Sequence, residues 1–147
     1  MPDLRVYPDR PFLAVSAAII RDGRVLIARR AKGASTGMFT LPGGVVEAGE
    51  TLHEAVIREI SEETGIAIEP VALAGHREFI TRDAHGRVER HFVILCFAAR
   101  WISGEGEPAL EELSELRWLE PAEIAGLKTT EGLAEIVASA FRLMEAC

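Results

Sequence analysis

Cysteine, excess positive charge and long apolar runs are all scarce in this chain, and each scarcity excludes a class of protein. The 147 residues include two cysteines and four histidines without ligand spacing, so neither a disulfide scaffold nor a zinc site is expected. The net charge of −7 argues against a protein that binds duplex nucleic acid, because such binding needs a basic face. The apolar segment 12–20 is far too short to span a bilayer.

The first residues also lack the apolar core of a secretion signal. Residues 1–11 carry mixed charges instead. We therefore expect a soluble cytoplasmic protein with no membrane partner. Cys96 lies in an apolar run and is predicted to be a buried thiol, and Cys147 is the last residue.

The composition is that of an ordinary globular domain. Hydrophobic residues make up 48% of the chain and charged residues 27%, which supports a buried core and does not favour disorder. The length fits one domain, and no repeat, low-complexity run or linker interrupts it. We therefore predict that residues 1–147 form a single domain.

Patterns of apolar residues and turn signals predict strands on both sides of one helix, followed by further strands and a terminal helix. The strands are expected at 12–21, 24–31, 38–41, 68–82 (in pieces broken around Gly75), 88–101 and 116–119, and the helices at 52–64, 121–126 and 130–146. Asp22–Gly23 is a strong hairpin signal. Segment 88–101 is apolar on both faces in its middle, so it should be central in the sheet. This order indicates an α/β fold with a mixed sheet between helices.

The helix at 52–64 has clear local signals at both ends. Thr51 is followed three residues later by Glu54, the pattern of a capping box. Gly65 stands where a left-handed C-terminal cap is favoured. Helical periodicity gathers three apolar residues on the side expected to face the core: Val56, Ile57 and Ile60.

The same helix carries a dense group of carboxylates. Glu59, Glu62 and Glu63 fall within an arc of roughly 100°, and the small side chain of Ala55 in that arc leaves room above them. Like charges so close repel one another. A hard cation such as Mg²⁺ or Mn²⁺ would replace this repulsion with attraction, since each carboxylate can bind the ion. Such an ion takes oxygen ligands and keeps waters for a phosphate-bearing substrate. The alternative is a solvated acidic helix face, which is common.

The surroundings of the carboxylates favour the metal site over the solvated face. A Gly43–Gly44 turn and Glu50 precede the helix, and Arg58 stands beside Glu59 in position to orient it or Glu62. The whole stretch fills the pattern G-x5-E-x7-R-E-U-x-E-E-x-G-U, where U is a bulky aliphatic residue. The specified positions are Gly44, Glu50, Arg58, Glu59, Ile60, Glu62, Glu63, Gly65 and Ile66.

This stretch resembles the Nudix box, the signature of the Nudix hydrolases, with no departure at any specified position. The resemblance covers nearly the whole chain in its order of elements, although only Gly44 to Ile66 matches a specific motif. It implies the Nudix α/β/α sandwich, with the mixed sheet between helices. It also implies hydrolysis of a diphosphate linkage in a nucleoside diphosphate joined to another group.

The resemblance also implies roles for individual residues. Glu59 and Glu63 would hold Mg²⁺ or Mn²⁺, with Glu62 and the carbonyl of Gly44 assisting. Glu62 is the first candidate for activating water, and Glu50 would hold Arg58 or a second metal. Some relatives draw a base from a later loop, where the chain offers Glu111, Glu112 and Glu115, although a solvated loop charge is the ordinary role of such residues.

Candidate substrate contacts lie before the box. Alternation places Arg29 and Arg30 on opposite faces of the strand at 24–31, so one of them points where apolar residues point. Either it is a strand-end arginine reaching solvent, or it contacts a phosphate or a base. Nudix relatives often place a substrate-contacting arginine near this point, and we add Phe39 to the candidates.

The expected substrate is ADP-ribose or another sugar nucleotide. The run Gly37 to Gly44 looks more like the sugar-nucleotide branch of the family than the triphosphate branch, and few basic residues lie near the box beyond Arg29, Arg30 and Lys32. The alternatives are a nucleoside triphosphate pyrophosphohydrolase, acting on oxidised deoxynucleotides among others, and a Nudix module that senses nucleotides without catalysis. The apolar first strand and terminal helix would support a homodimer.

Overall fold

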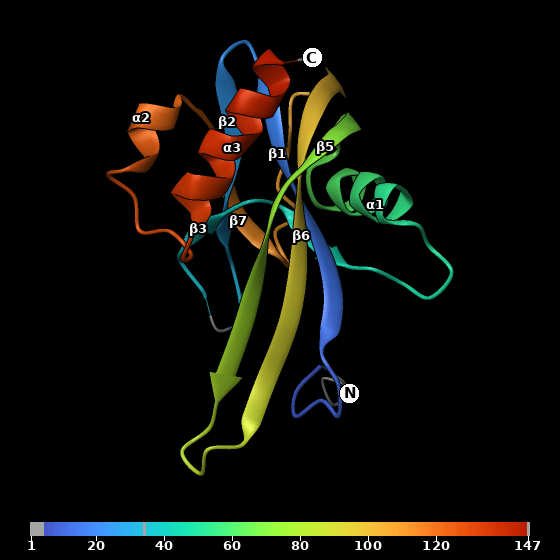
Figure 1. Cartoon of the computed structure of the whole chain (residues 1–147). Coiled ribbons are helices and arrows are strands. Elements are labelled where there is room, and N and C mark those ends of the chain that lie inside the picture. The colour runs from blue at the N-terminus through green and yellow to red at the C-terminus, as the bar shows by residue number, and fades with distance from the viewer. Residues whose placement is uncertain (1–4, 34, 147) are drawn as a thin grey trace.

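A mixed sheet of seven strands forms the centre of the computed structural model, which describes residues 5–33 and 35–146 (Figure 1). The strands are β1 (Phe12–Arg21), β2 (Arg24–Arg30), β3 (Phe39–Thr40), β4 (Gly43–Val45), β5 (Ala67–Arg82), β6 (Val88–Ser103) and β7 (Leu113–Leu119). The helices are α1 (Leu52–Thr64), α2 (Pro121–Ile124) and α3 (Leu133–Glu145). Cys147 lies outside the described residues.

The strand order is β3–β2–β1–β6–β5, with β4 paired to β1 and β7 paired to β2. β1 and β6 run parallel, from Phe12 opposite Phe92 to Ile20 opposite Arg100, while β1–β2 and β5–β6 are antiparallel. The tight turn between β1 and β2 uses positive φ angles at Asp22 (51°) and Gly23 (77°), as the hairpin signal predicts. β6 lies between β1 and β5, so its predicted central place is confirmed.

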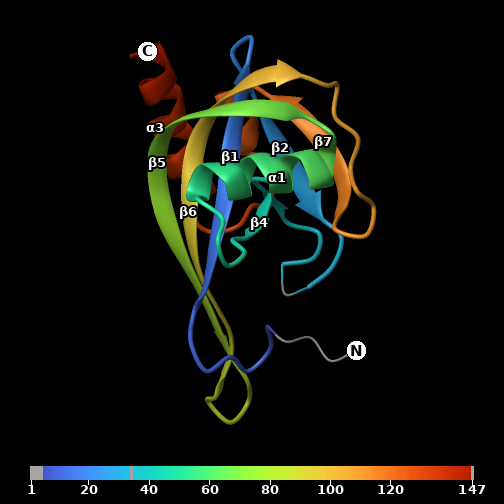
Figure 2. The same ribbon diagram turned by 90° about the vertical axis from the view of Figure 1, so that its right-hand side faces the viewer.

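Helices cover both faces of the sheet (Figures 1 and 2). α1 packs on one face over a core cluster that includes Val15 and Ile19, and it contributes Ala55, Val56 and Ile60. On the other face, α2 and α3 cover a cluster built on Val25, Ile27 and Cys96, to which α3 contributes Leu133, Ile136, Val137 and Ala140. The α/β/α sandwich with a mixed sheet is therefore confirmed.

Both predicted caps of α1 are present. Thr51 Oγ1 accepts from Glu54 N at 3.1 Å, Glu54 Oε1 accepts from Thr51 N at 2.9 Å, and Gly65 is left-handed with φ 71°. The predicted core face is wrong at one residue, since Ile57 is 42% exposed. Ala55 takes its place in the core, so it fills space under the helix and does not keep room above the carboxylates.

Three strands differ from the sequence prediction, and one of them, β7, begins at Leu113 and not at residue 116. β5 is continuous through Gly75, where the register with β6 shifts by a bulge and a Cβ would lie 2.6 Å from Ile136 Cδ1 of α3. Gly75 thus lies close against α3 and does not end the strand. β4 was expected only as a glycine turn, and its three residues pair with Ala14, Val15 and Ser16 of β1.

The β5–β6 hairpin extends well beyond the two helical layers (Figures 1 and 2). The segment before β1 lies against it, because Tyr7 N donates to Glu89 O at 2.7 Å and Tyr7 Oη donates to Asp83 at 2.9 Å. The inner part of this hairpin forms one side of the cavity described below. Of the helices in residues 5–33 and 35–146, none has the length and hydropathy needed to cross a bilayer.

Candidate active site

Two adjacent glycines bring the backbone of β4 against its neighbours. A Cβ on Gly43 would lie 2.1 Å from the carbonyl oxygen of Val15 in β1. A Cβ on Gly44 would lie 2.3 Å from the carboxylate carbon of Glu59. Glycine at these positions therefore lets β4 pair closely with β1 and lets the Glu59 carboxylate rest against the chain at Gly44.

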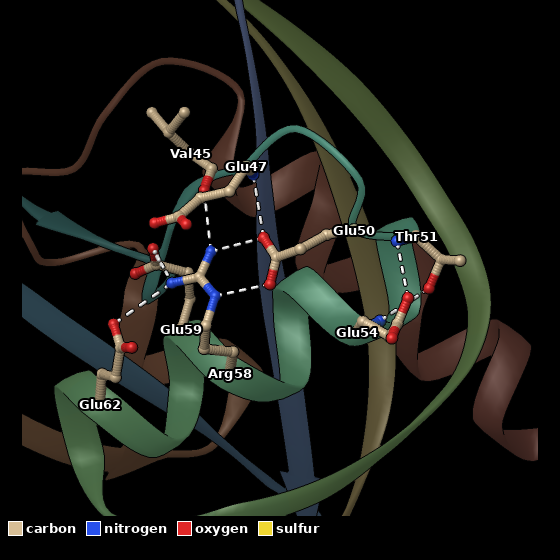
Figure 3. A network of polar contacts seen from close by, with 8 residues as sticks. All are labelled: Val45, Glu47, Glu50, Thr51, Glu54, Arg58, Glu59 and Glu62. Atoms are coloured by element: carbon tan, nitrogen blue, oxygen red, sulfur yellow. Dashed lines mark hydrogen bonds and ion pairs between the residues drawn. The ribbon is translucent and has the colours of Figure 1, made fainter.

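Arg58 is the centre of the polar network beside these glycines (Figure 3). Its Nε and Nη2 donate to the two oxygens of Glu50 at 2.6 and 2.8 Å, the paired geometry that makes such bonds strong. Nη1 donates to Glu59 at 2.8 Å and to Glu62 at 3.3 Å. Nη2 also donates to Val45 O at 3.1 Å, so Arg58 ties the helix to β4.

Of the two roles expected for Glu50, the structure shows the contact with Arg58. Glu50 also accepts from Glu47 N at 2.9 Å, which fixes the loop before α1. The hydrogen bonds from Arg58 lower the pKa of Glu50 to about 2. Glu50 therefore stays ionised and holds Arg58 in place.

Glu59 and Glu63 are the least exposed of the four carboxylates at this site, which are Glu50, Glu59, Glu62 and Glu63. Glu63 is 8% exposed and accepts from Gly43 N at 2.8 Å, and burial raises its pKa to about 7. Burial also raises the pKa of Glu59, although Arg58 acts in the opposite direction. A cation bound between these groups would offset the cost of burying two negative charges.

The donor set suits a hard divalent cation. Glu59, Glu62 and Glu63 each give one oxygen to the protein donors named above, which leaves each a second oxygen for a ligand. In the ranges 5–33 and 35–146, no three His, Cys, Asp or Glu side chains already converge as a finished metal centre. A metal bound here would require these carboxylates to turn toward one another, and the Glu62 side chain is 60% exposed.

We expect the metal-free protein to lose stability as the pH rises from about 4.5 to about 7, because of Glu63. Its folded-state pKa of about 7 lies above the ordinary 4.5, so unfolding releases a proton in this window and the free energy of unfolding falls. The whole shift corresponds to roughly 3 kcal/mol. Glu63→Gln removes the titration and can still accept from Gly43 N.

Thermal melts of the wild type and Glu63→Gln with a chelator, at about pH 5 and about pH 8, measure this effect. The melting temperature of the wild type should fall relative to that of the variant as the pH rises. Saturating Mn²⁺ should remove most of the fall, because the ion binds the ionised form. A difference between the two proteins that stays constant with pH would contradict the expectation.

The carboxylates face a cavity of about 700 Å³ that reaches from α1 to the β5–β6 hairpin. Arg30 lines it, together with Lys32 from the loop after β2 and Glu112 from the loop before β7. Arg29 and Phe39 do not line it. Arg29 pairs with Glu115 at 3.4 Å and lies over the ring of Phe39, which is 6% exposed in the core under α2 and α3.

The three carboxylates expected in a loop and considered as bases have different positions, and Glu115 lies on β7 instead. Glu112 lines the cavity and pairs with Lys32 at 3.1 Å. Glu115 is held by Arg29 and Arg117 away from the cavity lining, and Glu111 is also absent from that lining. Geometry therefore keeps Glu112 as the candidate from this loop.

The sequence interpretation missed one wall of the cavity, the part of β5 and β6 that carries Arg77, Phe79, Arg90 and Phe92. A signal for it exists in the alternation of Arg77 and Phe79 along β5, which places both on one face. The hairpin register adds Phe92 opposite Phe79. These residues lie at least 11 positions beyond the Nudix-like stretch, counting from Ile66 to Arg77, so no local motif includes them.

Comparisons with known proteins agree with this fold and site. The sequence profile of the NUDIX domain matches residues 10–140, so the chain belongs to the Nudix hydrolase family. It is 40% identical over 95 residues to the ADP-ribose pyrophosphatase of Methanocaldococcus jannaschii, and the aligned residues make up 65% of this chain and 54% of that protein. It is 30% identical over 131 residues to the NAD-capped RNA hydrolase NudC of Photobacterium profundum, covering 89% and 46%.

Among solved structures, the MutT NUDIX hydrolase of Burkholderia pseudomallei superposes with a TM-score of 0.78 at 31% identity. That match covers 89% of this chain and 98% of the other. By contrast, the chain spans about half the length of the two relatives above. Members of the family generally use divalent metal ions.

Proposed function

We propose that the chain hydrolyses the diphosphate linkage of ADP-ribose or a similar sugar nucleotide with Mg²⁺ or Mn²⁺ as its cofactor. The observation that carries the proposal is one cavity that holds both halves of such a site. Glu59, Glu62 and Glu63 supply oxygen ligands, and Arg30 and Lys32 supply positive charge for phosphate oxygens. The name of the relative that is 40% identical, an ADP-ribose pyrophosphatase, supports this substrate.

Glu59 and Glu63, with Glu62 and the Gly44 carbonyl assisting, would hold the metal in this proposal. The bound ion would neutralise phosphate oxygens and acidify a water molecule. Glu62 has the exposed carboxylate next to these groups, and it orients the attacking water and takes its proton. Glu112 is the second candidate for that proton. Arg58, fixed by Glu50, keeps the carboxylates in position.

The reaction balances without any other reactant. A water oxygen bonds to one phosphorus, the bridging P–O bond breaks, and the bridging oxygen leaves with the other phosphate. ADP-ribose then gives AMP and ribose 5-phosphate. The proton of the water passes to the carboxylate and on to solvent.

A nucleoside triphosphate is the second candidate, and the cavity gives a reason for it. In the sequence, few basic residues lie near the Nudix-like stretch, and this scarcity argued against a triphosphate. In the fold, Arg77 and Arg90 from β5 and β6 line the same cavity as Arg30 and Lys32. The scarcity of positive charge therefore no longer argues against a more highly charged substrate.

Comparing kcat/KM for ADP-ribose, other sugar nucleotides, and canonical and oxidised triphosphates tests the proposal in Mg²⁺ and in Mn²⁺. We expect the highest value for ADP-ribose, with AMP and ribose 5-phosphate as products and ¹⁸O from labelled water in one of them. A preference for any triphosphate would replace the substrate. Tight binding of ADP-ribose with no turnover in either metal would instead indicate a nucleotide sensor.

A further inference from the structure

Arg77 is a largely buried cation whose hydrogen bonds are incomplete. It lies on β5, and its Nη2 donates to Thr130 Oγ1 at 2.8 Å. Thr130 Oγ1 also lies 2.9 Å from Thr40 Oγ1, so the hydroxyl is held between two partners. Nη1 of Arg77 is shielded from solvent and finds no acceptor in the part of the chain that the structure describes.

An unpaired buried donor on a charged group is costly, and proteins rarely keep one without a reason. The mechanism proposed above does not use Arg77. Its side chain nevertheless lines the same cavity as Glu59 and Glu63. The missing acceptor is therefore expected to come from a ligand that fills this end of the cavity.

The neighbours of Arg77 indicate which part of a ligand it meets. Phe79 and Phe92 line the cavity beside it, with ring centroids 6.4 Å apart, and Ile94 lies opposite Arg77 in the β5–β6 register. This wall therefore combines a tilted pair of aromatic rings with the guanidinium groups of Arg77 and Arg90. Arg30 and Lys32, by contrast, lack aromatic neighbours in the cavity lining that the structure shows on their strand and loop, and Arg30 is near enough to act electrostatically on Glu63.

We propose that Arg77, with the aromatic pair Phe79 and Phe92, forms the subsite for the nucleobase. The base lies against the aromatic pair, and the guanidinium of Arg77 turns toward the cavity so that Nη1 donates to a ring nitrogen or carbonyl oxygen on the edge of the base. A base has the apolar faces and edge acceptors that this wall matches, whereas a phosphate would have to leave water beside two phenyl rings. The inference rests on the proposed function only in taking a nucleotide as the ligand.

The test measures binding of AMP, with ribose 5-phosphate as the ligand that lacks a base, by calorimetry in Mg²⁺. Arg77→Met should weaken AMP binding by about 10- to 100-fold, the range for a hydrogen bond to a charged group. Binding of ribose 5-phosphate should not change. The ligand-free melting temperature should stay the same or rise, because methionine fills the site without an unpaired charge.

Arg82→Met is the matched control, since it makes the same change further along β5. Arg82 donates to Gly86 O at the end of the hairpin and does not line the cavity, so both ligands should bind as they do to the wild type. Arg77→Lys tests the geometry. Lysine keeps the charge without the planar fork and should recover only part of the AMP affinity.

Three results would overturn the proposal. Equal losses for AMP and ribose 5-phosphate in Arg77→Met would make Arg77 a phosphate ligand. An unchanged AMP affinity would remove it from the site, and a lower melting temperature with both ligands affected would make its role structural. GMP, CMP and UMP are measured in the same way, and no Arg77-dependent binding of any of the four would also reject the subsite.

Because these experiments measure product binding, they do not depend on turnover. A protein that fails to hydrolyse ADP-ribose and still loses AMP affinity in Arg77→Met would contradict the proposed function and support the subsite. A protein that hydrolyses ADP-ribose equally well with and without Arg77, at unchanged AMP affinity, would support the proposed function and contradict the subsite.

Discussion

Glu59→Gln and Glu63→Gln should each lower kcat by roughly 100- to 1000-fold while the protein stays folded. Both changes keep the size of the side chain and remove one negative charge from the proposed metal site. A glutamine oxygen is a weaker ligand for Mg²⁺ than a carboxylate, so the ion would neutralise the phosphate less well. The loss should appear at saturating substrate, since it concerns the transition state.

Measurements of kcat at saturating Mg²⁺, with circular dichroism and thermal melts, test this expectation. Glu54→Gln is the matched control on the same helix, because glutamine also suits the capping box and Glu54 does not line the cavity. Its kcat should stay close to that of the wild type. A folded Glu59→Gln or Glu63→Gln protein with wild-type kcat would show that the metal-site assignment is wrong.

Local hydrogen bonds explain which parts of the fold were readable from the sequence. The caps of α1 involve residues a few positions apart, so Thr51, Glu54 and Gly65 were predictable. The glycines and carboxylates of the site were readable for the same reason, since they fall in one continuous stretch. The pairing of Glu50 with Arg58 crosses only eight positions.

Features that depend on tertiary packing were not readable in this way. Ile57 has the hydrophobicity of a core residue, but the turn of α1 that faces the sheet places Ala55 inward and leaves Ile57 exposed. Phe39 was a candidate substrate contact, yet β3 pairs with β2 so that its ring lies in the core under α3. Arg77 comes to the site only through the register of a long hairpin.

The packing also bears on the expectation of a homodimer. That expectation used the apolar character of the first strand and the terminal helix. In the fold, Val15, Ala17 and Ile19 of β1 are buried under α1, and the apolar stripe of α3 is buried against the sheet. Both apolar surfaces are explained by the core of one chain, so the homodimer stays a prediction without support from these elements.

Gly44→Ala should impair the proposed site with little loss of stability, whereas Gly43→Ala should destabilise the fold. The added Cβ at Gly44 would lie 2.3 Å from the carboxylate of Glu59, which is the end of a flexible side chain and can move away. The Cβ at Gly43 would lie 2.1 Å from Val15 O and 2.6 Å from Ser16 Cα, both in the backbone of β1. Relieving that clash means separating β4 from β1, at a cost of about 1–3 kcal/mol or more.

Melting temperatures and kcat/KM at several Mn²⁺ concentrations distinguish the two outcomes. We expect Gly44→Ala to melt near the wild type, to need more Mn²⁺ for half-maximal activity, and to lose about 100-fold in kcat/KM. Gly43→Ala should melt clearly lower. If Gly44→Ala melts lower by as much as Gly43→Ala, the close approach at Gly44 serves the fold and not the site.

A double-variant comparison identifies the cause of the Gly44→Ala loss. Alanine keeps the backbone carbonyl of residue 44, so the loss is expected to come from displacement of Glu59. Once Glu59 is already glutamine, adding Gly44→Ala should then cost little further activity, because the two changes affect one interaction. Losses that multiply in the double variant would instead show that residue 44 acts independently of Glu59, through its own carbonyl or through the backbone of β4.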